Sequence, residues 1–492
     1  MPFILALDQS TSASKALLFD AKGQLVDKTA IDHKQYYPEP GWVEHDAEEI
    51  YQNTIHACKL LLKRNRPVAR EILCLSITNQ RETVVVFEKG TGRPLYHAIV
   101  WQCRRGSALC EELLRANYGE LVHRITGLRI DTYFPAPKLR WLFDYHPDIH
   151  AQLVERKALL GTIDTYLIYR LTHGQVFATD HTNASRTLLY DIGKLRWDEG
   201  LCKLFDVPMD SLPSVAKCSA KFGTTDLGGA LENPIPICGV MGDSQAALFA
   251  ERCFHPGSAK VTLGTGSSVL LNIGETLKLP TKGSVSTIGW INEVSTAYAF
   301  EGIINFTGAV IAWLKDQLGL ISQVEETEGL AAAVPDNGGV YLVPAFVGLS
   351  APYWEPNAKG AIVGLTPATD KRHIVRAALE SIAYQIKDVL LEMMTEAAIP
   401  LRFVHADGGM VNNRFLLNFV AGITQLTVRA STLPELSALG AVFSGGLGMG
   451  LFGSLEELDL LPHGFVEYHP AMELALAEKN YQGWKDAVRR VL

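Results

Sequence analysis

The sequence predicts an α/β protein of two domains, in which the second half of the chain repeats the architecture of the first. The chain has 492 residues, more than one hydrophobic core usually serves, so two domains with a cleft between them are expected. A short apolar run, a turn rich in Ser, Thr and Gly, and a second apolar run occur at residues 3–20 and again at residues 258–275. Strand-like and helical segments follow each of these hairpins, as in mixed α/β folds.

The first half begins with a predicted antiparallel meander. Residues 3–31 read as three strands, joined by a polar turn after Asp8 and a second turn at Lys22 and Gly23. A helix is expected after Asp46, which is placed as an N-cap before acidic residues and helically spaced apolar ones. Strands are expected again in ILCLSITNQ and TVVVFEKGTGRPL.

The second half repeats this order. Residues 258–275 predict strand, turn and strand, STAYAFEGI a further strand, and TGAVIAWLKDQLGL a helix. Residues 401–428 predict strand, Gly-rich turn, helix and strand, the unit that places a helix N-terminus beside phosphates. We expect the hinge within residues 237–249, which gives domains of residues 1–247 and 248–492.

The two hairpin turns have the composition of phosphate-binding loops. Small residues after Asp8 allow backbone N–H groups to approach an anion, and Lys15 adds a positive charge. The turn around Thr265 has the same character, so the two could hold a triphosphate from both sides of the cleft. Asp407, Gly408 and Gly409 offer a third Gly-rich contact. For the first turn, the alternative is an ordinary Ser/Thr-rich hairpin whose hydroxyl groups face solvent.

Several other site types do not fit the sequence. No GxxxxGK[ST] motif occurs, and GGLGMG at residues 445–450 follows a helical run, which favours close helix packing over a dinucleotide site. The eight cysteines include no CxxC pair, which favours buried thiols over a disulfide framework or a zinc site. A redox role for Cys103 and Cys110 is the alternative to burial.

Charge and hydropathy limit the partners. The net charge is -8, with 45 basic and 53 acidic side chains and no long Lys/Arg run, which argues against nucleic acid. The apolar stretch PFILAL ends at Asp8 and is too short for a signal peptide or a membrane span. We therefore expect a soluble, cytoplasmic protein without a membrane partner.

The motifs of this chain resemble those of the FGGY carbohydrate kinases, and within them the glycerol kinase branch. YFPAPKLRW at residues 133–141 and GAIVGLTPATDKRHIVRAALE at residues 360–380 fit the two family signatures. Further matching blocks are PGWVEHD, ITNQRET, IVWQCRR, TNASRT, QAALF and APYW. The resemblance covers the chain from the first strand to the C-terminal helices. It implies an α/β, two-domain actin/Hsp70-like (ribonuclease H-like) duplicated fold with an ATP cleft between the lobes.

The resemblance also implies an activity and a set of site residues. The activity is transfer of the γ-phosphoryl group of Mg-ATP to a primary hydroxyl of a small polyol or ketose. Asp243 is implied as the general base and Asp8 as a ligand that holds Mg²⁺ through water. The implied nucleotide-binding residues are Thr11, Ser12, Ala13, Lys15, Thr265, Gly308, Gly409 and Asn413. The implied acceptor-binding residues are Arg81, Glu82, Trp101, Tyr133, Asp243 and Ser244.

Three of these residues have a structural alternative. Asp243 could cap the helix that follows it, a role that is compatible with catalysis. Without the flanking match, Arg81 and Glu82 would read as a surface charge pair.

The chain departs from the family pattern at four positions. Lys15 stands where glycerol kinases have Arg, and Ala312 replaces a nucleotide-contacting Gln. In the acceptor pocket, Ser244 replaces a Gln and Ser268 replaces an aromatic residue. Both pocket changes are large-to-small, so they predict an acceptor longer than glycerol. The loop of residues 222–236 also lacks the Arg used for inhibition by a sugar bisphosphate, so that regulation is not expected.

Two classes of function therefore stand as hypotheses. The first is an ATP-dependent polyol or sugar kinase, with glycerol kinase proper as its named variant. The second is an actin-like ATP-binding protein without sugar kinase activity. Retention of the acceptor-pocket residues favours the kinase, because a sensor needs no base beside a polyol pocket. The sequence leaves the oligomeric state open, and a homodimer or homotetramer is one of the options because dimers and tetramers are common among the relatives.

Overall fold

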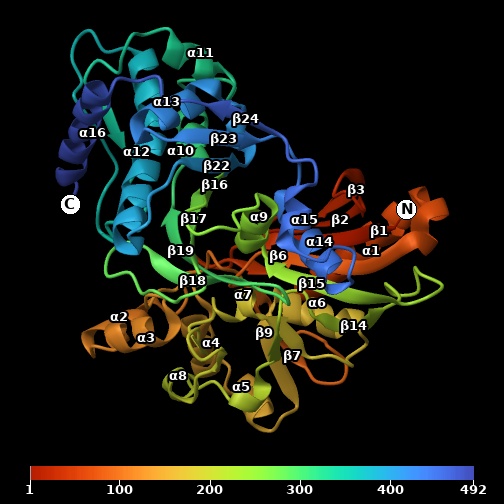
Figure 1. Ribbon diagram of the computed structural model, residues 1–492. Helices are drawn as coiled ribbons and strands as arrows, with labels where there is room; N and C mark the ends of the chain where they lie inside the picture. Colours follow the sequence, from red (N-terminus) through yellow and green to blue (C-terminus); the bar gives the residue numbers. More distant parts are fainter. Residues whose placement is uncertain (1) are drawn as a thin grey trace.

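The computed structural model describes residues 2–492 and shows two lobes, each built around a mixed β-sheet (Figure 1). A smaller sheet with short helices extends below the first lobe in this view. The meander, the helix after Asp46, the second hairpin and the Gly-rich βα unit all form where the sequence predicts them.

The first lobe is organised by a six-stranded sheet in the order β14-β15-β6-β1-β2-β3. β1 pairs antiparallel with β2 and parallel with β6, and β6 pairs parallel with β15. The strands are β1 (Phe3–Gln9), β2 (Ala13–Asp20), β3 (Leu25–Asp32), β6 (Ile72–Asn79), β14 (Lys221–Thr225) and β15 (Ile235–Gly242).

The second lobe is organised by a seven-stranded sheet in the order β18-β19-β17-β16-β22-β23-β24. β16 pairs antiparallel with β17 and parallel with β22, and β22 pairs parallel with β23, which repeats the pairing of the first sheet. The fold is therefore duplicated. The strands are β16 (Ala259–Leu263), β17 (Ser267–Gly274), β18 (Val285–Ile291), β19 (Thr296–Ile304), β22 (Phe403–Asp407), β23 (Thr427–Ser431) and β24 (Phe465–Tyr468).

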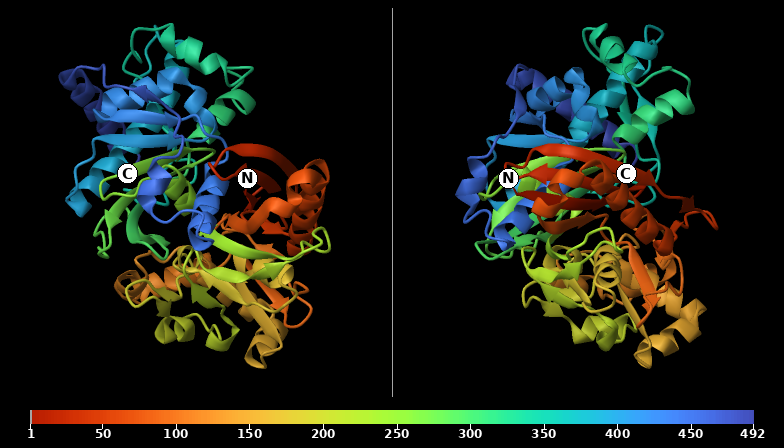
Figure 2. Two further views of the ribbon diagram at one scale, coloured as in Figure 1. Left: turned by 45° about the vertical axis from the view of Figure 1, so that its right-hand side comes forward. Right: turned by 90° about the vertical axis from the view of Figure 1, so that its right-hand side faces the viewer.

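Helices cover both sheets, as the two further views show (Figure 2). α1 (Ala47–Arg64) packs on β2 and β3, with Asp46 accepting two N–H bonds as its N-cap. α14 (Leu436–Gly448) packs on β15, β6 and β1, so a helix from the C-terminal half covers the sheet of the first half. The other helices of the two lobes include α9 (Asp243–Ala250), α10 (Gly308–Asp316), α11 (Glu326–Ala332), α12 (Lys371–Ala397), α13 (Arg414–Thr424) and α16 (Leu474–Arg489).

The smaller region forms around a five-stranded sheet in the order β4-β5-β8-β7-β9. Its strands are β4 (Gln35–Tyr36), β5 (Glu44–His45), β7 (Val84–Glu88), β8 (Ala98–Ile99) and β9 (Ala158–Thr162). The helices around it are α2 (Ser107–Arg115), α3 (Gly119–Thr126), α4 (Pro135–Tyr145), α5 (Pro147–Val154), α6 (Ile163–Leu171), α7 (His181–Ala184) and α8 (Glu199–Leu204). The remaining elements are β10 (Ala178–Asp180), β11 (Tyr190–Asp191), β12 (Arg196–Trp197), β13 (Ser214–Ala216), β20 (Tyr341–Val343), β21 (Ala361–Val363), α15 (Leu455–Asp459) and short 3₁₀ turns.

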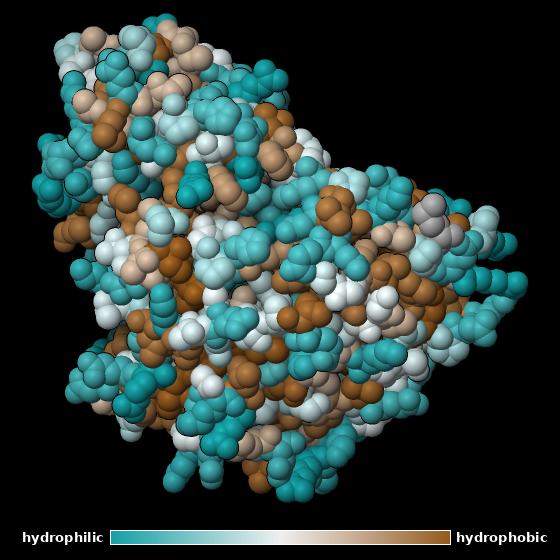
Figure 3. Space-filling view, in the orientation of Figure 1, coloured by the Kyte–Doolittle hydropathy of each residue, from teal (hydrophilic) through white to brown (hydrophobic). Residues whose placement is uncertain are grey.

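The core and surface agree with several sequence expectations. All eight cysteines are buried and unpaired. Gly445 and Gly448 lie within α14 and pack tightly: a Cβ at Gly448 would come 2.0 Å from the carbonyl oxygen of Ser219. Within residues 2–492, none of the helices combines the length and the apolar character needed to cross a lipid bilayer. Hydrophilic and hydrophobic residues are interspersed on the face seen in Figure 3, which has a concave step between the two lobes.

Candidate active site

The turn between β1 and β2 presents a buried carboxylate and a lysine. Asp8 lies near the end of β1 and faces Lys15 across the antiparallel register. Lys15 Nζ lies 3.0 Å from Asp8 Oδ2 and 2.9 Å from Glu435 Oε2, at the start of α14. Burial raises the pKa of Asp8, against the lowering effect of Lys15. The lysine is thus held between two carboxylates at the place where the sequence predicts a phosphate site.

The residues of this turn face two environments. Thr11 is partly buried, and its hydroxyl oxygen accepts a hydrogen bond of 3.0 Å from Trp101 Nε1. Ser12 is exposed, whereas Ala13 is buried at the start of β2. The expectation of solvent-facing hydroxyls therefore describes Ser12 but not Thr11, which links the turn to an aromatic side chain of the predicted acceptor pocket.

The second hairpin turn borders a pocket of about 310 Å³. The Gly264 carbonyl accepts a 2.9 Å hydrogen bond from Gly308 N–H at the start of α10. A Cβ at Gly308 would lie 2.7 Å from that carbonyl oxygen, so this close approach requires glycine. The pocket thus lies at the N-terminal end of a helix, where anions are favoured. Its lining is Leu263, Gly264, Thr265, Gly308, Ala309, Ala312, Gly409 and Met410.

One predicted nucleotide residue has its polar atoms engaged elsewhere. Asn413 caps α13 by accepting a 2.9 Å hydrogen bond from Leu416 N–H. Its amide donates to Thr327 Oγ1 at 3.1 Å. Thr265, Gly308 and Gly409 therefore come together around the pocket, while Asn413 secures the following helix and lies outside the lining.

Arg81 and Glu82 lie inside the protein, so the alternative of a surface charge pair is wrong. Their exposed fractions are 4% and 1%. Arg81 Nε lies 3.2 Å from Asp243 Oδ1, and its two terminal nitrogens donate to Glu301 Oε1 at 2.8 Å and Gln245 Oε1 at 3.1 Å. Since Glu301 belongs to the sheet of the second lobe, Arg81 joins the two lobes beside the predicted base.

A second arginine completes this buried network. Arg186 has an exposed fraction of 0% and donates from Nε to Glu82 Oε1 at 2.6 Å. Its Nη1 lies 2.6 Å from Glu301 Oε2. Burial alone would raise the pKa of Glu301, but Arg186 and Arg81 together lower it to about 2. Two arginines thus alternate with two glutamates in a site shielded from water.

Sequence reasoning did not assign roles to Glu301, Arg186 or Gln245. The usable signal was the acid at position 301, which stands among apolar residues in the strand TAYAFEGII and therefore needs a buried cation. Arg186 belongs to the TNASRT block and Gln245 to the segment DSQAALF. Neither motif indicates the partner of its residue, Glu301 for Arg186 and Arg81 for Gln245, because each partner lies more than 100 residues away along the chain.

Two aromatic residues form a wall near this network. The ring centroids of Trp101 and Tyr133 are 5.4 Å apart. Burial, and next Glu82, raise the pKa of the Tyr133 hydroxyl. Lys138, which is fully buried, donates to the carbonyl oxygens of Val100, Trp101 and Tyr133 at 2.9–3.1 Å and so fixes both aromatic residues.

Asp243 lies where these parts meet. It is the first residue of α9, and its side chain has an exposed fraction of 39%. The N-cap is Gly242, without a side-chain bond, while Asp243 Oδ1 accepts a 2.7 Å hydrogen bond from Ser244 N–H. Asp243 therefore helps to secure the first helical turn while it also contacts Arg81.

Asp243 is linked to the first hairpin turn electrostatically and to the second through a chain of side chains. On one side, the negative charge of Asp243 raises the pKa of Asp8, in addition to the larger effect of burial. On the other side, Ser268, two residues after the second turn, donates to Glu301 Oε1 at 2.9 Å, and Glu301 holds Arg81 against Asp243. Asp243 is thus a partly exposed carboxylate that contacts the buried arginine–glutamate network and acts electrostatically on Asp8.

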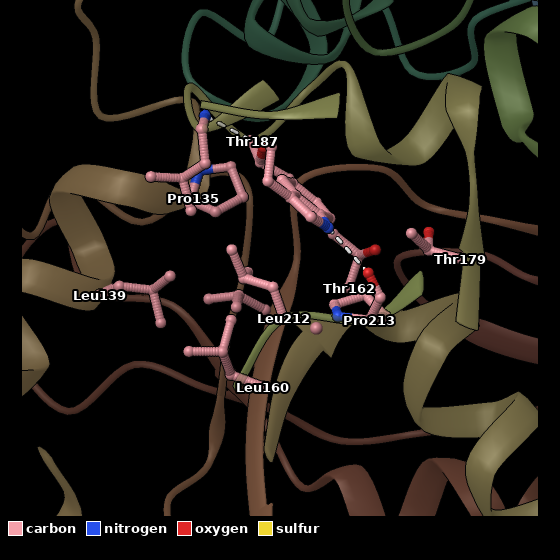
Figure 4. A pocket seen from close by; sticks show the side chains of 12 residues that line it. Pro135, Leu139, Leu160, Thr162, Thr179, Thr187, Leu212 and Pro213 are labelled. Carbon is pink, nitrogen blue, oxygen red and sulfur yellow. Dashed lines mark hydrogen bonds between the residues drawn. The ribbon is translucent and has the colours of Figure 1, made fainter. Parts of the chain in front are cut away.

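A separate small cavity lies in the smaller region and takes no part in this site (Figure 4). Its volume is about 10 Å³, at most enough for one water molecule. Side chains of Pro135, Leu139, Leu160 and Leu212 surround it, together with the hydroxyl-bearing Thr162, Thr179 and Thr187. It is too small for a sugar or a polyol.

Comparisons with known proteins agree with this geometry. Residues 3–250 match the family model for the N-terminal domain of the FGGY family of carbohydrate kinases, and residues 259–449 match that for its C-terminal domain. Glycerol kinase 1 of Thermotoga maritima is 47% identical over 100% of this chain and 99% of its own length. A glycerol kinase of Desulfitobacterium hafniense is 45% identical over 100% and 99%.

Solved structures give the same result for the fold. Plasmodium falciparum glycerol kinase with ADP superposes with a TM-score of 0.93 at 35% identity, covering 100% of this chain and 98% of that one. A xylulose kinase from Lactobacillus acidophilus has a TM-score of 0.87 at 19% identity, covering 99% and 97%, and supports the fold alone.

Proposed function

Because the chain belongs to the FGGY family of carbohydrate kinases, we propose that it transfers the γ-phosphoryl group of ATP to a primary hydroxyl of a small polyol or ketose. The observation that carries this proposal is the position of Asp243, which contacts Arg81 and lies within electrostatic reach of Asp8. The glycerol kinases among the relatives support a polyol acceptor.

The residues present fit a magnesium nucleotide. Asp8 offers a buried carboxylate next to the first hairpin turn, and Mg²⁺ favours one or two carboxylates together with water and phosphate oxygens. When bound, Mg²⁺ supplies charge neutralisation at the transferred phosphoryl group. Gly409 leaves open space where a side chain would stand, which suits a bound nucleotide.

The chain's own residues would act by positioning and by moving one proton. Asp243 would accept the proton of the acceptor hydroxyl, and Arg81 orients its carboxylate from 3.2 Å. Lys15 and the N–H groups of the two turns would hold phosphate oxygens. Trp101 and Tyr133 would cover the carbon chain of the acceptor. Arg186 holds Glu82 in place through a hydrogen bond. The proposed role of Glu82 is to position Arg81 and to accept a hydrogen bond from one hydroxyl group of the substrate.

Two small side chains, Ser244 and Ser268, support an acceptor pocket that takes more than three carbons. Ser268 uses its hydroxyl on Glu301 and leaves no side chain beyond it, and Ser244 is a small, partly exposed residue beside the base. We therefore propose an acceptor longer than glycerol, a polyol or ketose with one or two further carbons. Glycerol kinase proper is the second candidate, favoured by the relatives named above.

Ser244→Gln combined with Ser268→Phe is expected to shift specificity toward glycerol. Filling the pocket should raise the ratio of kcat/KM for glycerol to that for a four- or five-carbon polyol by about 10-fold or more, as one or two methylenes are typically worth. Parallel initial-rate assays measure the ratio, with the exposed Ser322→Gln as the matched control. A ratio that falls or equals that of the control would contradict the account of the pocket.

A coupled assay of ADP release over a panel of polyols and ketoses tests the function itself. The kinase predicts turnover that depends on the acceptor and is lost in both Asp8→Ala and Asp243→Asn. An actin-like ATP-binding protein predicts turnover that is independent of the acceptor, lost in Asp8→Ala and unchanged in Asp243→Asn. The second result would overturn the proposal.

Location and assembly are further proposals. Eight free, buried cysteines suit a reducing compartment, and ATP and small polyols are cytoplasmic metabolites, so a cytoplasmic location is proposed. The resemblance to enzymes that form dimers or tetramers supports a homodimer or homotetramer. No nucleic-acid or membrane partner is proposed, since the net charge is -8.

A further inference from the structure

Three side chains outside the candidate active site form a compact cluster, here called the Glu–His cluster: Glu251, His405 and His463. They come from the end of α9, the middle of β22 and the segment before β24. Glu251 Oε2 lies 3.1 Å from His405 Nδ1 and 3.3 Å from His463 Nε2. The ligand atoms of all three lie within 4.8 Å of one another.

The carboxylate of this cluster lacks a permanent cation. Glu251 has an exposed fraction of 0%, and a buried carboxylate is costly unless a positive charge compensates it. Among residues 2–492, the ion pairs of Glu251 come from the two histidines, which carry charge only when protonated. The buried Lys260 acts on the neighbouring Asp407: burial raises the pKa of Asp407 to about 6, against the lowering effect of Lys260.

Hydrogen bonding within the described residues leaves two atoms of the cluster without a partner. Glu251 Oε1 and His405 Nδ1 are both buried and unsatisfied. His405 Nδ1 is close to Glu251 Oε2, yet the pair lacks hydrogen-bond geometry, whereas His463 Nε2 is hydrogen-bonded to the carboxylate. Buried polar groups of native proteins rarely remain unpaired. A bound cation that accepts a lone pair from Glu251 Oε1 and from His405 Nδ1 would satisfy both atoms.

We propose that the Glu–His cluster binds a divalent transition-metal ion of the zinc class. Two imidazole nitrogens and a carboxylate are a common zinc ligand set, with bonds of about 2.0–2.2 Å. Tetrahedral ligands on such bonds are about 3.3–3.5 Å apart. The two separations from Glu251 Oε2, 3.1 and 3.3 Å, are close to this, and all three ligand atoms lie within 4.8 Å of one another. His463 is partly exposed, which leaves a path to solvent and a position for a fourth, water ligand.

The bound ion would act as a structural clamp between parts of the proposed kinase site. α9 carries Asp243 at its other end, about 12 Å away along the helix axis. β22 ends at Asp407, immediately before the Gly-rich turn that contributes Gly409 to the pocket. The ion would therefore tie the helix of the predicted base to the nucleotide-side sheet. The proposal depends on the three ligands alone and not on the identity of the reaction.

Metal titration of the full chain tests the site. After chelator treatment, the wild-type protein should bind Zn²⁺ at one ion per chain, and Co²⁺ should give the visible absorption of a tetrahedral site. The melting temperature should rise by at least about 2 °C with Zn²⁺, because a ligand of the native state stabilises it. Glu251→Gln and His463→Ala should weaken binding by at least about 10- to 100-fold, the cost reported for losing even a partner of a ligand.

The exposed His469→Ala serves as the matched control and should bind like the wild type. Wild-type protein that takes up no Zn²⁺, or binds it no more tightly than His463→Ala, would overturn the proposal. A melting temperature that responds to pH but not to Zn²⁺ or Co²⁺ would also overturn it, because the cluster would then be a proton-linked ion pair. The wild-type measurements decide the matter even where a variant fails to fold.

Discussion

Asp243→Asn is expected to lower kcat by about 10²- to 10⁴-fold, the usual contribution of a positioned general base. Asparagine keeps the size of the side chain but cannot accept the proton of the acceptor hydroxyl at neutral pH. The KM for ATP should change little, because the contacts proposed for the nucleotide come from the two hairpin turns. Steady-state kinetics with the best acceptor of the panel measure both constants.

Asp144→Asn is the control for this substitution. Asp144 lies on the surface of α4, where it pairs with Arg140, and its replacement should leave kcat unchanged. The melting temperature of each variant shows whether the fold is retained. A folded Asp243→Asn enzyme with wild-type kcat would show that another group takes the proton.

Arg186→Met is expected to destabilise the protein by about 3–5 kcal/mol, the cost of removing one partner from a buried ion pair. Arg186 is fully buried and contacts both Glu82 and Glu301, so its loss leaves carboxylates without one of their two cations. Methionine has a similar length, which separates the loss of charge from the loss of volume. Urea unfolding followed by circular dichroism measures the change.

The control is Arg156→Met, in a surface pair with Asp210 in which both side chains are more than half exposed. Exposed pairs contribute about 0–1 kcal/mol, so this variant should unfold close to the wild type. Equal unfolding midpoints for the two variants would mean that the buried network does not hold the lobes together.

Local sequence patterns predicted much of the fold. The hairpin around Thr265 repeats the one after Asp8. In each sheet, the first strand of the hairpin pairs antiparallel with the second strand and parallel with a later one. The sequence could not predict that α14 packs on the sheet of the first lobe. Helical periodicity identifies the apolar face of a helix but not the sheet against which that face packs. It also missed the five-stranded sheet, three of whose strands are only two residues long.

For the candidate site too, the sequence predicted some of the residues but not the contacts between distant parts of the chain. Thr265, Gly308 and Gly409 were expected near the nucleotide, and the structure places them around one pocket. Without the flanking motif, Arg81 and Glu82 would read as surface charges. The structure instead buries both and pairs them with Glu301 and Arg186. Contacts between residues this far apart in the chain depend on the packing of two lobes, which one sequence does not encode in any local spacing.

The account rests on the claim that the two hairpin turns hold one nucleotide with Asp243 facing its terminal phosphate. A crystal structure with Mg²⁺, a non-hydrolysable ATP analogue and an acceptor polyol tests this claim most directly. The account predicts phosphate oxygens in contact with residues 10–13 and 264–266, and the acceptor hydroxyl within hydrogen-bond distance of Asp243. A nucleotide bound to one lobe only, or an acceptor remote from Asp243, would contradict it.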